Sequence, residues 1–113
     1  MKPVLEDPNV TKRDQYSRYE LKAAGKIWKD CTSYSQKEEK IPRQFDTKFG
    51  DIRVTIMFGS LWYPGKWSFD CSDIGLQGGM NAETPTQAAE IAVQQCADHL
   101  SKQLQYFTDE KDY

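Results

Sequence analysis

Side chains able to carry out acid–base or nucleophilic chemistry are few in this sequence and widely spaced. The single histidine, His99, follows Cys96 by three residues, so both would share one face of a helix. A thiol beside an imidazole can form a nucleophilic dyad, and Cys71 would complete a Cys/Cys/His set for zinc. We favour the plainer interpretation, in which Cys96 is a small core residue bordered by His99, because no Cys-x-x-Cys pair supports a metal site.

Paired carboxylates are the next candidates for chemistry. Asp70 and Asp73 stand near the end of a predicted strand, and Glu38 is followed directly by Glu39. Such a pair could bind magnesium, but ordinary solvated strand ends have the same composition. The sequence contains no phosphate-binding Walker loop, nucleophile elbow or His-Glu-x-x-His motif. We therefore predict no catalytic residues, no metal and no cofactor, and we expect that the protein is not an enzyme.

Composition excludes two further classes of protein. Hydrophobic residues make up 38% of the 113 residues and charged residues 28%, which fits one globular domain rather than a disordered tail. The longest apolar run is too short to span a membrane, and the first residues lack the apolar run of a secretory signal. Three cysteines, an odd number, indicate free thiols in a reducing compartment. We expect a cytoplasmic protein with no membrane partner.

Charge is distributed unevenly along the chain. Residues 1–53 contain twelve Lys and Arg against nine Asp and Glu, whereas residues 54–113 contain three against eight. The acidic second half is therefore poorly suited to binding nucleic-acid phosphates.

The spacing of apolar residues predicts the elements that position these side chains. Residues 1–10 contain two prolines and are expected to form an extended arm. From Thr11 onward, apolar residues recur every three or four positions, which predicts an amphipathic helix of about 18 residues. The predicted stripe consists of Tyr16, Tyr19, Ala23, Ile27 and Cys31.

After Arg43 the period changes to two, which predicts strands over 43–49 and 52–58 with a turn at Gly50-Asp51. A second turn is indicated by Tyr63-Pro-Gly-Lys66, since proline and glycine suit its two central positions. With that turn at the centre of a hairpin, Trp62 would face Trp67. This register also places the apolar residues of both strands on one face.

Two further elements complete the expected fold. A short third strand around Ile74 and Leu76 would end at the following glycines. Thr84-Pro-Thr-Gln87 has the composition of a capping box with proline at the first helical position, which predicts a helix of about 20 residues. The fold class is therefore α+β, a two-layer sandwich with an N-terminal helix, an antiparallel sheet of two or three strands and a C-terminal helix. It would form a single domain over residues 11–107, followed by an acidic tail over 108–113.

This α-β-β-β-α order resembles the double-stranded-RNA-binding domain, most clearly in the segment from Thr84 to Ala92, which is similar to the start of that family's final helix. Three glycines lie where that family has a glycine-rich strand end: Gly75, Gly78 and Gly79. The positions of its phosphate-binding lysines hold no basic residue here: Pro85, Thr86 and Ala89. The last fifty residues also resemble HicB-like antitoxins, through strands, a glycine turn and a helix that opens on Thr-x-x-x-Ala.

Aromatic residues are the most suggestive feature of the expected surface. Phe, Trp and Tyr make up 12% of the chain, and two of the three tryptophans flank the predicted hairpin turn. Large rigid aromatic side chains bury much area at low entropic cost, so they favour protein contact, and they also stack on single-stranded bases. The candidate patch consists of Trp62, Tyr63, Lys66 and Trp67. An alternative interpretation is that both tryptophans close the end of the core.

The sequence thus predicts a non-enzymatic protein-binding module. In style it resembles the inhibitors that phages use against host defence or transcription machinery. One alternative is a nucleic-acid-binding domain of double-stranded-RNA-binding-like fold, and another is a HicB-like antitoxin. Nucleic acid would be bound by a basic ridge on the first predicted helix: Arg18, Lys22, Lys26 and Lys29. A homodimer paired through a sheet edge near Phe45 is also compatible with the sequence.

Overall fold

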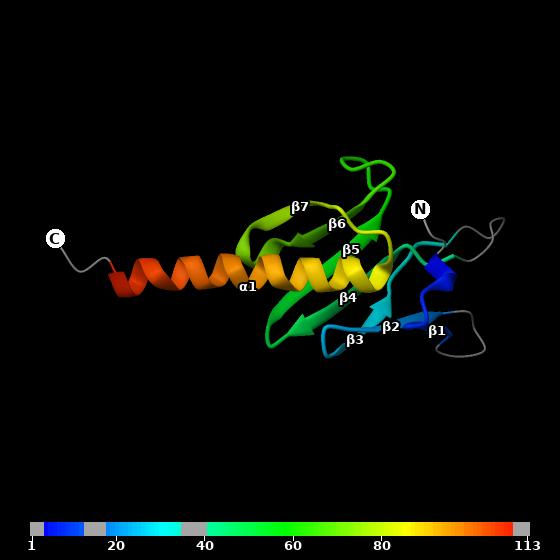
Figure 1. The fold of residues 1–113 in the computed structure, drawn as a ribbon, viewed down its shortest axis with the longest axis horizontal. Coiled ribbons are helices and arrows are strands. Elements are labelled where there is room, and N and C mark those ends of the chain that lie inside the picture. The colour runs from blue at the N-terminus through cyan, green and yellow to red at the C-terminus, as the bar shows by residue number, and fades with distance from the viewer. Residues whose placement is uncertain (1–3, 13–17, 35–40, 110–113) are drawn as a thin grey trace.

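A computed structural model describes residues 4–12, 18–34 and 41–109, which form seven strands, two short 3₁₀ helices and one long α-helix (Figure 1). The strands are β1 (Val10–Lys12), β2 (Tyr19–Ala23), β3 (Lys26–Asp30), β4 (Gln44–Phe49), β5 (Ile52–Phe58), β6 (Trp67–Cys71) and β7 (Leu76–Met80). The helices are η1 (Val4–Glu6), η2 (Ser72–Ile74) and α1 (Pro85–Asp109).

The seven strands form one antiparallel sheet in which each strand pairs with the next along the chain. The helix α1 lies across one face of this sheet and contacts β2, β5, β6 and β7 (Figure 1). The predicted fold is therefore wrong. The described chain has no N-terminal α-helix, its sheet has seven strands rather than two or three, and its single α-helix follows the sheet.

The described part of the predicted first helix forms β1, β2 and β3. Its reversal lies at Ala24-Gly25, where φ is 53° and 72°, as a two-residue hairpin of type I′ requires. On β2 the side chains of Leu21 and Ala23 enter the core, whereas Lys22 is exposed. Ile27 of the predicted stripe is 55% exposed. Side chains along this stretch therefore alternate between the two faces of a sheet, and the three- and four-residue spacing that predicted a helix does not determine the structure. Tyr16, also assigned to the stripe, lies outside the described residues.

The core lies between the inner face of the sheet and α1. Trp28 is fully buried opposite Leu21, and its Nε1 donates a hydrogen bond to the carbonyl oxygen of Ala23 at 2.9 Å. The Trp28 ring also meets the ring of Phe49 edge-on, with centroids 6.2 Å apart. The largest fully buried side chains are Trp28, Trp67, Phe45, Leu21, Ile56 and Val54.

The two halves of α1 have different surroundings. In the first half, Ala88, Ala89, Ala92 and Cys96 are buried against the sheet, and their small size lets the helix approach it closely. From Ala97 to Thr108 no side chain is buried. Figure 1 shows this second half projecting past the edge of the sheet.

The start of α1 follows the sequence prediction. Pro85 is the first helical residue, and the backbone N–H of Gln87 donates to Oγ1 of Thr84 at 3.1 Å. The Gln87 side chain in turn accepts a hydrogen bond from the backbone N–H of Glu83 at 2.9 Å. Thr84 thus caps the helix as predicted, because capping depends on neighbouring residues only.

Asp7 adds a second cap from the other end of the chain. Its Oδ2 accepts hydrogen bonds from the Thr86 backbone N–H at 2.9 Å and from Thr86 Oγ1 at 2.7 Å. Its Oδ1 accepts one from the Asn9 backbone N–H at 2.9 Å. The carboxylate is buried, and a negative charge is favourable at a helix N-terminus. Residues 4–10 of the predicted arm therefore pack on the domain, with Val4 and Val10 in the core, and residues 1–3 lie outside the described residues.

The strands predicted over 43–49 and 52–58 are confirmed as β4 and β5, which meet at the Gly50-Asp51 turn. The predicted pairing of β5 with β6 is also present, but its register differs. Phe58 lies opposite Trp67, not opposite Cys71 as the short turn implied. The shift is an even number of residues, so it leaves every side chain on its predicted face of the sheet.

Candidate functional site

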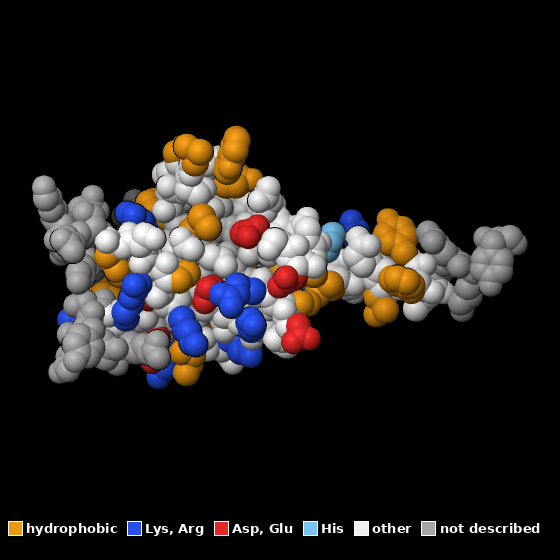
Figure 2. All heavy atoms as spheres, turned by 180° about the vertical axis from the view of Figure 1, so that it is seen from behind, with side chains coloured by type: hydrophobic (Ala, Val, Ile, Leu, Met, Phe, Trp, Pro, Cys, Tyr) orange, Lys and Arg blue, Asp and Glu red, His pale blue; other side chains and the backbone are white. Residues whose placement is uncertain are grey.

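Large apolar side chains are exposed on two projections of the molecule. One is the loop 59–66 between β5 and β6, where Leu61 is 88% and Trp62 is 84% exposed. The other is the half of α1 that projects past the sheet, residues 97–109, which we name the free half. There Phe107 is 87% exposed. Figure 2 shows both as hydrophobic groups at the outline of the molecule, well apart from each other. We name Leu61 and Trp62 the loop tip.

Backbone hydrogen bonds hold the loop that carries the loop tip. The N–H of Gly59 donates to the carbonyl oxygen of Lys66 at 3.0 Å, which closes the base of the loop. Within it, the N–H of Tyr63 donates to the carbonyl oxygen of Ser60 and to Ser60 Oγ, both at 3.2 Å. Gly59 and Gly65 have φ values of 74° and 73°, which favour glycine. The sharp reversal at Leu61 and Trp62 is therefore built into the loop.

Tyr63 anchors the loop to the sheet. Its ring lies against Gly79 on β7, so closely that a Cβ atom at position 79 would be only 2.8 Å from Tyr63 Cδ1. The same Cβ would be 3.6 Å from the side chain of Lys66. Gly79 thus provides the space that Tyr63 occupies. The loop tip is held on a rigid base, although its own side chains are in solvent.

The predicted aromatic patch is divided between surface and core. Trp62 and Lys66 are exposed, and Tyr63 is half-buried. Trp67 is fully buried on the inner face, with its ring 5.6 Å from that of Phe58, so it is a core residue and cannot contact a partner. Its Nε1 has no hydrogen-bond partner among the described residues. Leu61 was not among the predicted site residues. The sequence did contain a signal for it, because Leu61 stands beside Trp62 and has no apolar residue opposite it in the predicted hairpin.

The four basic residues assigned to a helical ridge do not form one. Arg18 is held by the loop before β4, with its Nη1 donating to the Thr32 carbonyl oxygen at 2.8 Å and its guanidinium 5.3 Å from the centre of the Tyr34 ring. Lys26 lies over the ring of Phe49, also at 5.3 Å. Only Lys22 and Lys29 share the outer face of the sheet.

The pKa values of all three cysteines are raised. Cys71 on β6 and Cys96 on α1 are buried in mutual contact, and burial, together with Cys71, raises the pKa of Cys96 to about 12. Burial also raises the pKa of Cys71. Burial and the charge of Asp46 raise the pKa of Cys31 to about 11. Because the thiolate is the reactive form, the raised pKa of Cys96 disfavours a role for it as a nucleophile at neutral pH.

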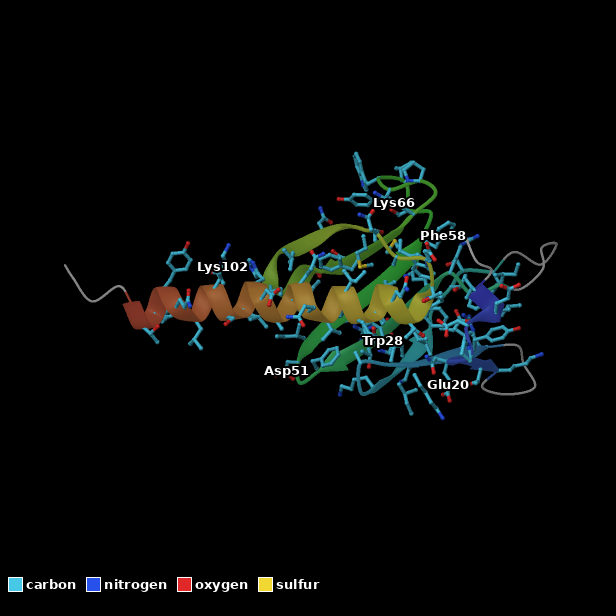
Figure 3. All side chains as sticks on the ribbon, viewed as in Figure 1. Glu20, Trp28, Asp51, Phe58, Lys66 and Lys102 are labelled. Atoms are coloured by element: carbon cyan, nitrogen blue, oxygen red, sulfur yellow. The ribbon has the colours of Figure 1, made fainter. Side chains whose placement is uncertain are left out.

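The other sequence candidates for chemistry are His99, Asp73 and the Glu38/Glu39 pair. His99 lines a polar hollow beside α1 together with Leu76, Asp98 and Lys102, and Figure 3 shows Lys102 on the free half of the helix. Asp73 accepts a hydrogen bond from the backbone N–H of Arg53 at 2.8 Å, which is a structural role. Glu38 and Glu39 lie outside the described residues. No group of three or more His, Cys, Asp or Glu in the described ranges is placed to hold a metal ion.

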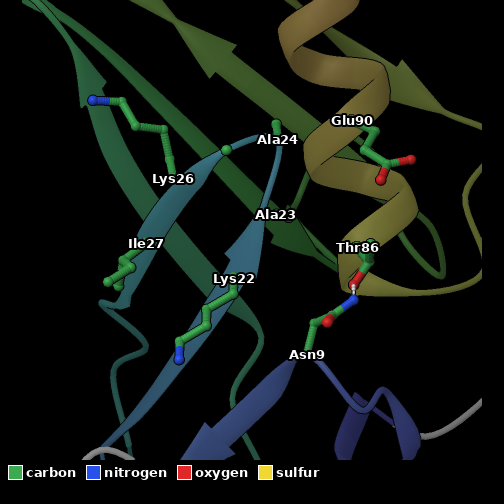
Figure 4. Close-up of a pocket in the computed structure, with 9 residues that line it drawn as sticks. Asn9, Lys22, Ala23, Ala24, Lys26, Ile27, Thr86 and Glu90 are labelled. Atoms are coloured by element: carbon green, nitrogen blue, oxygen red, sulfur yellow. Dashed lines mark hydrogen bonds between the residues drawn. The ribbon is translucent and has the colours of Figure 1, made fainter.

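A separate hollow of about 480 Å³ lies between the β2–β3 turn and the start of α1 (Figure 4). Lys22 and Lys26 line it from the hairpin, and Glu90 lines it from the helix. Across it, Asn9 Nδ2 donates a hydrogen bond to Thr86 Oγ1 at 3.0 Å. This bond adds to the hydrogen bonds between Asp7 and the helix. We therefore interpret the hollow as part of the packing contact between the N-terminal segment and the start of α1.

Comparison of the chain with protein-family models, with curated proteins and with solved structures finds no match. None of the helices within residues 4–12, 18–34 and 41–109 is long and apolar enough to cross a membrane. The function is therefore inferred from the geometry of the site alone.

Proposed function

We propose that the protein is a non-catalytic protein-binding module and that the loop tip inserts into an apolar pocket of its partner. The observation that carries this proposal is the combination of full exposure at Leu61 and Trp62 with an anchored loop base at Tyr63. Binding hot spots are rich in tryptophan and lie in well-packed, desolvated centres of interfaces. A side chain presented on a rigid base also loses little conformational entropy on binding.

The surroundings of the loop tip favour a protein over a polyanion. Lys66 is the only charged side chain within the loop 59–66. On the outer face of the sheet, seen in Figure 2, basic residues do gather around Lys29 and Lys48, but Arg53 there is paired with Asp46 at 3.0 Å. Nucleic-acid binding would have to use that face and not the loop tip. The inhibitor role against host defence or transcription machinery is a narrower form of our proposal, and identifying the partner would test it.

The test is capture of partners from a lysate on tagged protein, with and without nuclease, followed by affinity measurement with the partner identified. Trp62→Ala is expected to weaken binding at least about tenfold, because it removes the largest side chain of the contact. Gly79→Ala should weaken it less, by displacing Tyr63 and loosening the loop base. Phe107→Ala, an equally exposed aromatic residue on the other projection, is the matched control and should leave affinity unchanged.

Two results would contradict the proposal. Wild-type affinity of Trp62→Ala for the captured protein would exclude the loop tip as the contact. Loss of all captured material on nuclease treatment, together with binding of the untreated material that falls steeply as salt is raised, would instead favour nucleic-acid binding through the basic outer face.

A further inference from the structure

An apolar stripe runs from Val93, at the border of the core, along the free half of α1, where no described part of the chain covers it. Its members alternate at steps of four and three residues, which is the spacing of a helix–helix seam. They are Val93, Ala97, Leu100, Leu104 and Phe107. Val93 borders the core, and the other four are exposed. We name these five residues the α1 seam.

The α1 seam is separate from the face that docks on the sheet. On a helical projection, the buried residues Ala88, Ala92 and Cys96 and the α1 seam lie on neighbouring faces about 100° apart. A second helix could therefore lie along the α1 seam without displacing the sheet. The exposed part, from Ala97 to Thr108, is about 18 Å long, which is three turns.

The charges around the α1 seam are compatible with a copy of itself. The positions that flank a seam are occupied by uncharged polar residues: Gln94, Ser101, Gln103 and Thr108. The charged residues Asp98 and Lys102 lie on the far side of the helix. When two identical helices pair, flanking charges of one sign would repel each other, and here there are none.

The side-chain sizes select the orientation of such a pair. In an antiparallel pair, the largest member of the α1 seam, Phe107, lies opposite the smallest exposed one, Ala97, and Leu100 lies opposite Leu104 of the other copy. The four layers then have similar total volumes. A parallel pair would instead place Phe107 on Phe107 and Ala97 on Ala97, which gives one overfilled layer and one empty layer.

From these observations we propose that the chain forms a homodimer in which the free halves of two α1 helices pack antiparallel along their α1 seams. The interface is small compared with the roughly 800 Å² per partner of a stable complex, so we expect an equilibrium between monomer and dimer in the micromolar range. The two sheets then lie at opposite ends of the assembly, because each helix projects away from its own sheet.

The first test is sedimentation equilibrium of the purified chain from about 1 to about 500 µM. The wild type is expected to change from monomer to dimer across this range. Leu104→Glu should raise the dissociation constant at least about tenfold, because it places a charge in the centre of the α1 seam. Gln105→Glu introduces the same charge one residue further on, facing away, and should leave the dimer intact. A wild type that is monomeric throughout, or a dimer unaffected by Leu104→Glu, would overturn the proposal.

The second test addresses the orientation. Leu100→Lys and Leu104→Glu are each expected to be monomeric alone, and an equimolar mixture should form a heterodimer because the new charges face each other only in an antiparallel pair. Monomers in the mixture would overturn the antiparallel arrangement. Circular dichroism of each variant, compared with the wild type, confirms that the exposed substitutions leave the fold unchanged. These tests use the purified chain alone, so their outcome is independent of the partner proposed for the loop tip.

Discussion

The two halves of α1 are continuous in sequence pattern but opposite in environment. The half from Pro85 to Cys96 presents small residues and is covered by the sheet, whereas the half from Ala97 to Asp109 presents leucines and a phenylalanine and is uncovered. The larger apolar side chains are thus the ones left in water. Hydrophobic size alone does not determine burial: the close approach of helix and sheet admits only small side chains, and the larger ones lie where the helix has passed the edge of the sheet.

Substitutions in the covered half should reduce the free energy of unfolding most. Ala92 is fully buried where the helix is close to the sheet, so Ala92→Phe must push the two layers apart. We expect a loss of about 3 kcal/mol or more in the free energy of unfolding, measured by urea denaturation. A loss below about 0.5 kcal/mol would mean that the helix is not closely packed there.

The cap at the start of the covered half should have the next largest effect. Asp7→Ala leaves the N–H and hydroxyl of Thr86 and the N–H of Asn9 without their acceptor. The expected loss is about 2 kcal/mol in the free energy of unfolding. Asp7→Asn keeps one side-chain oxygen and should lose less. Equal effects of the two substitutions would show that the hydrogen bonds do not carry the stabilisation.

Alkaline pH should weaken the covered half through its thiol. The pKa of Cys96 is about 12 in the folded protein against 9.0 for a free thiol, so the folded state holds this proton more tightly than the unfolded state. The stabilisation is complete below pH 9 and is lost as pH rises toward 12. At pH 10 the expected loss is about 1 kcal/mol in the free energy of unfolding. The test is chemical denaturation as a function of pH. The free energy of unfolding of Cys96→Ala should fall less steeply with pH over this window than that of the wild type. Equal slopes would refute the assignment of the effect to Cys96.

Substitutions in the uncovered half should change the free energy of unfolding least. Leu104→Ser exchanges a leucine that is mostly in solvent, so it should change the free energy of unfolding of the dilute monomer by less than about 0.5 kcal/mol. Thermal denaturation at low protein concentration measures this. A larger loss would show that the monomer itself covers Leu104.

Local signals explain what could be predicted from the sequence. The start of α1 was correct because Thr84, Pro85 and Gln87 interact with their immediate neighbours. The strands β4 and β5 were correct because each shows uninterrupted alternation. The β5–β6 register was wrong because the loop is held by Tyr63 on Gly79, a contact that the turn residues themselves do not reveal.

The first predicted helix failed because two periods compete over residues 19–31. Ala23, Ile27 and Cys31 have helical spacing, but the same stretch alternates about Leu21 and Trp28, and Ala24-Gly25 supplies the turn. Gly25 was the available signal, since glycine after a polar alternating run favours a hairpin. The cap from Asp7 could not be predicted at all, because its partner Thr86 lies 79 residues away.

The bond between Asp7 and Thr86 also constrains how the chain can acquire its structure during synthesis. The carboxylate that caps α1 is made before every strand of the sheet, and its partner is made only after all of them. Until α1 emerges, the inner face of the sheet, with Trp28, Phe45 and Trp67, has no cover. A ribosome stalled before residue 85 would therefore hold an aggregation-prone intermediate, and we expect this intermediate to depend on chaperones until α1 docks.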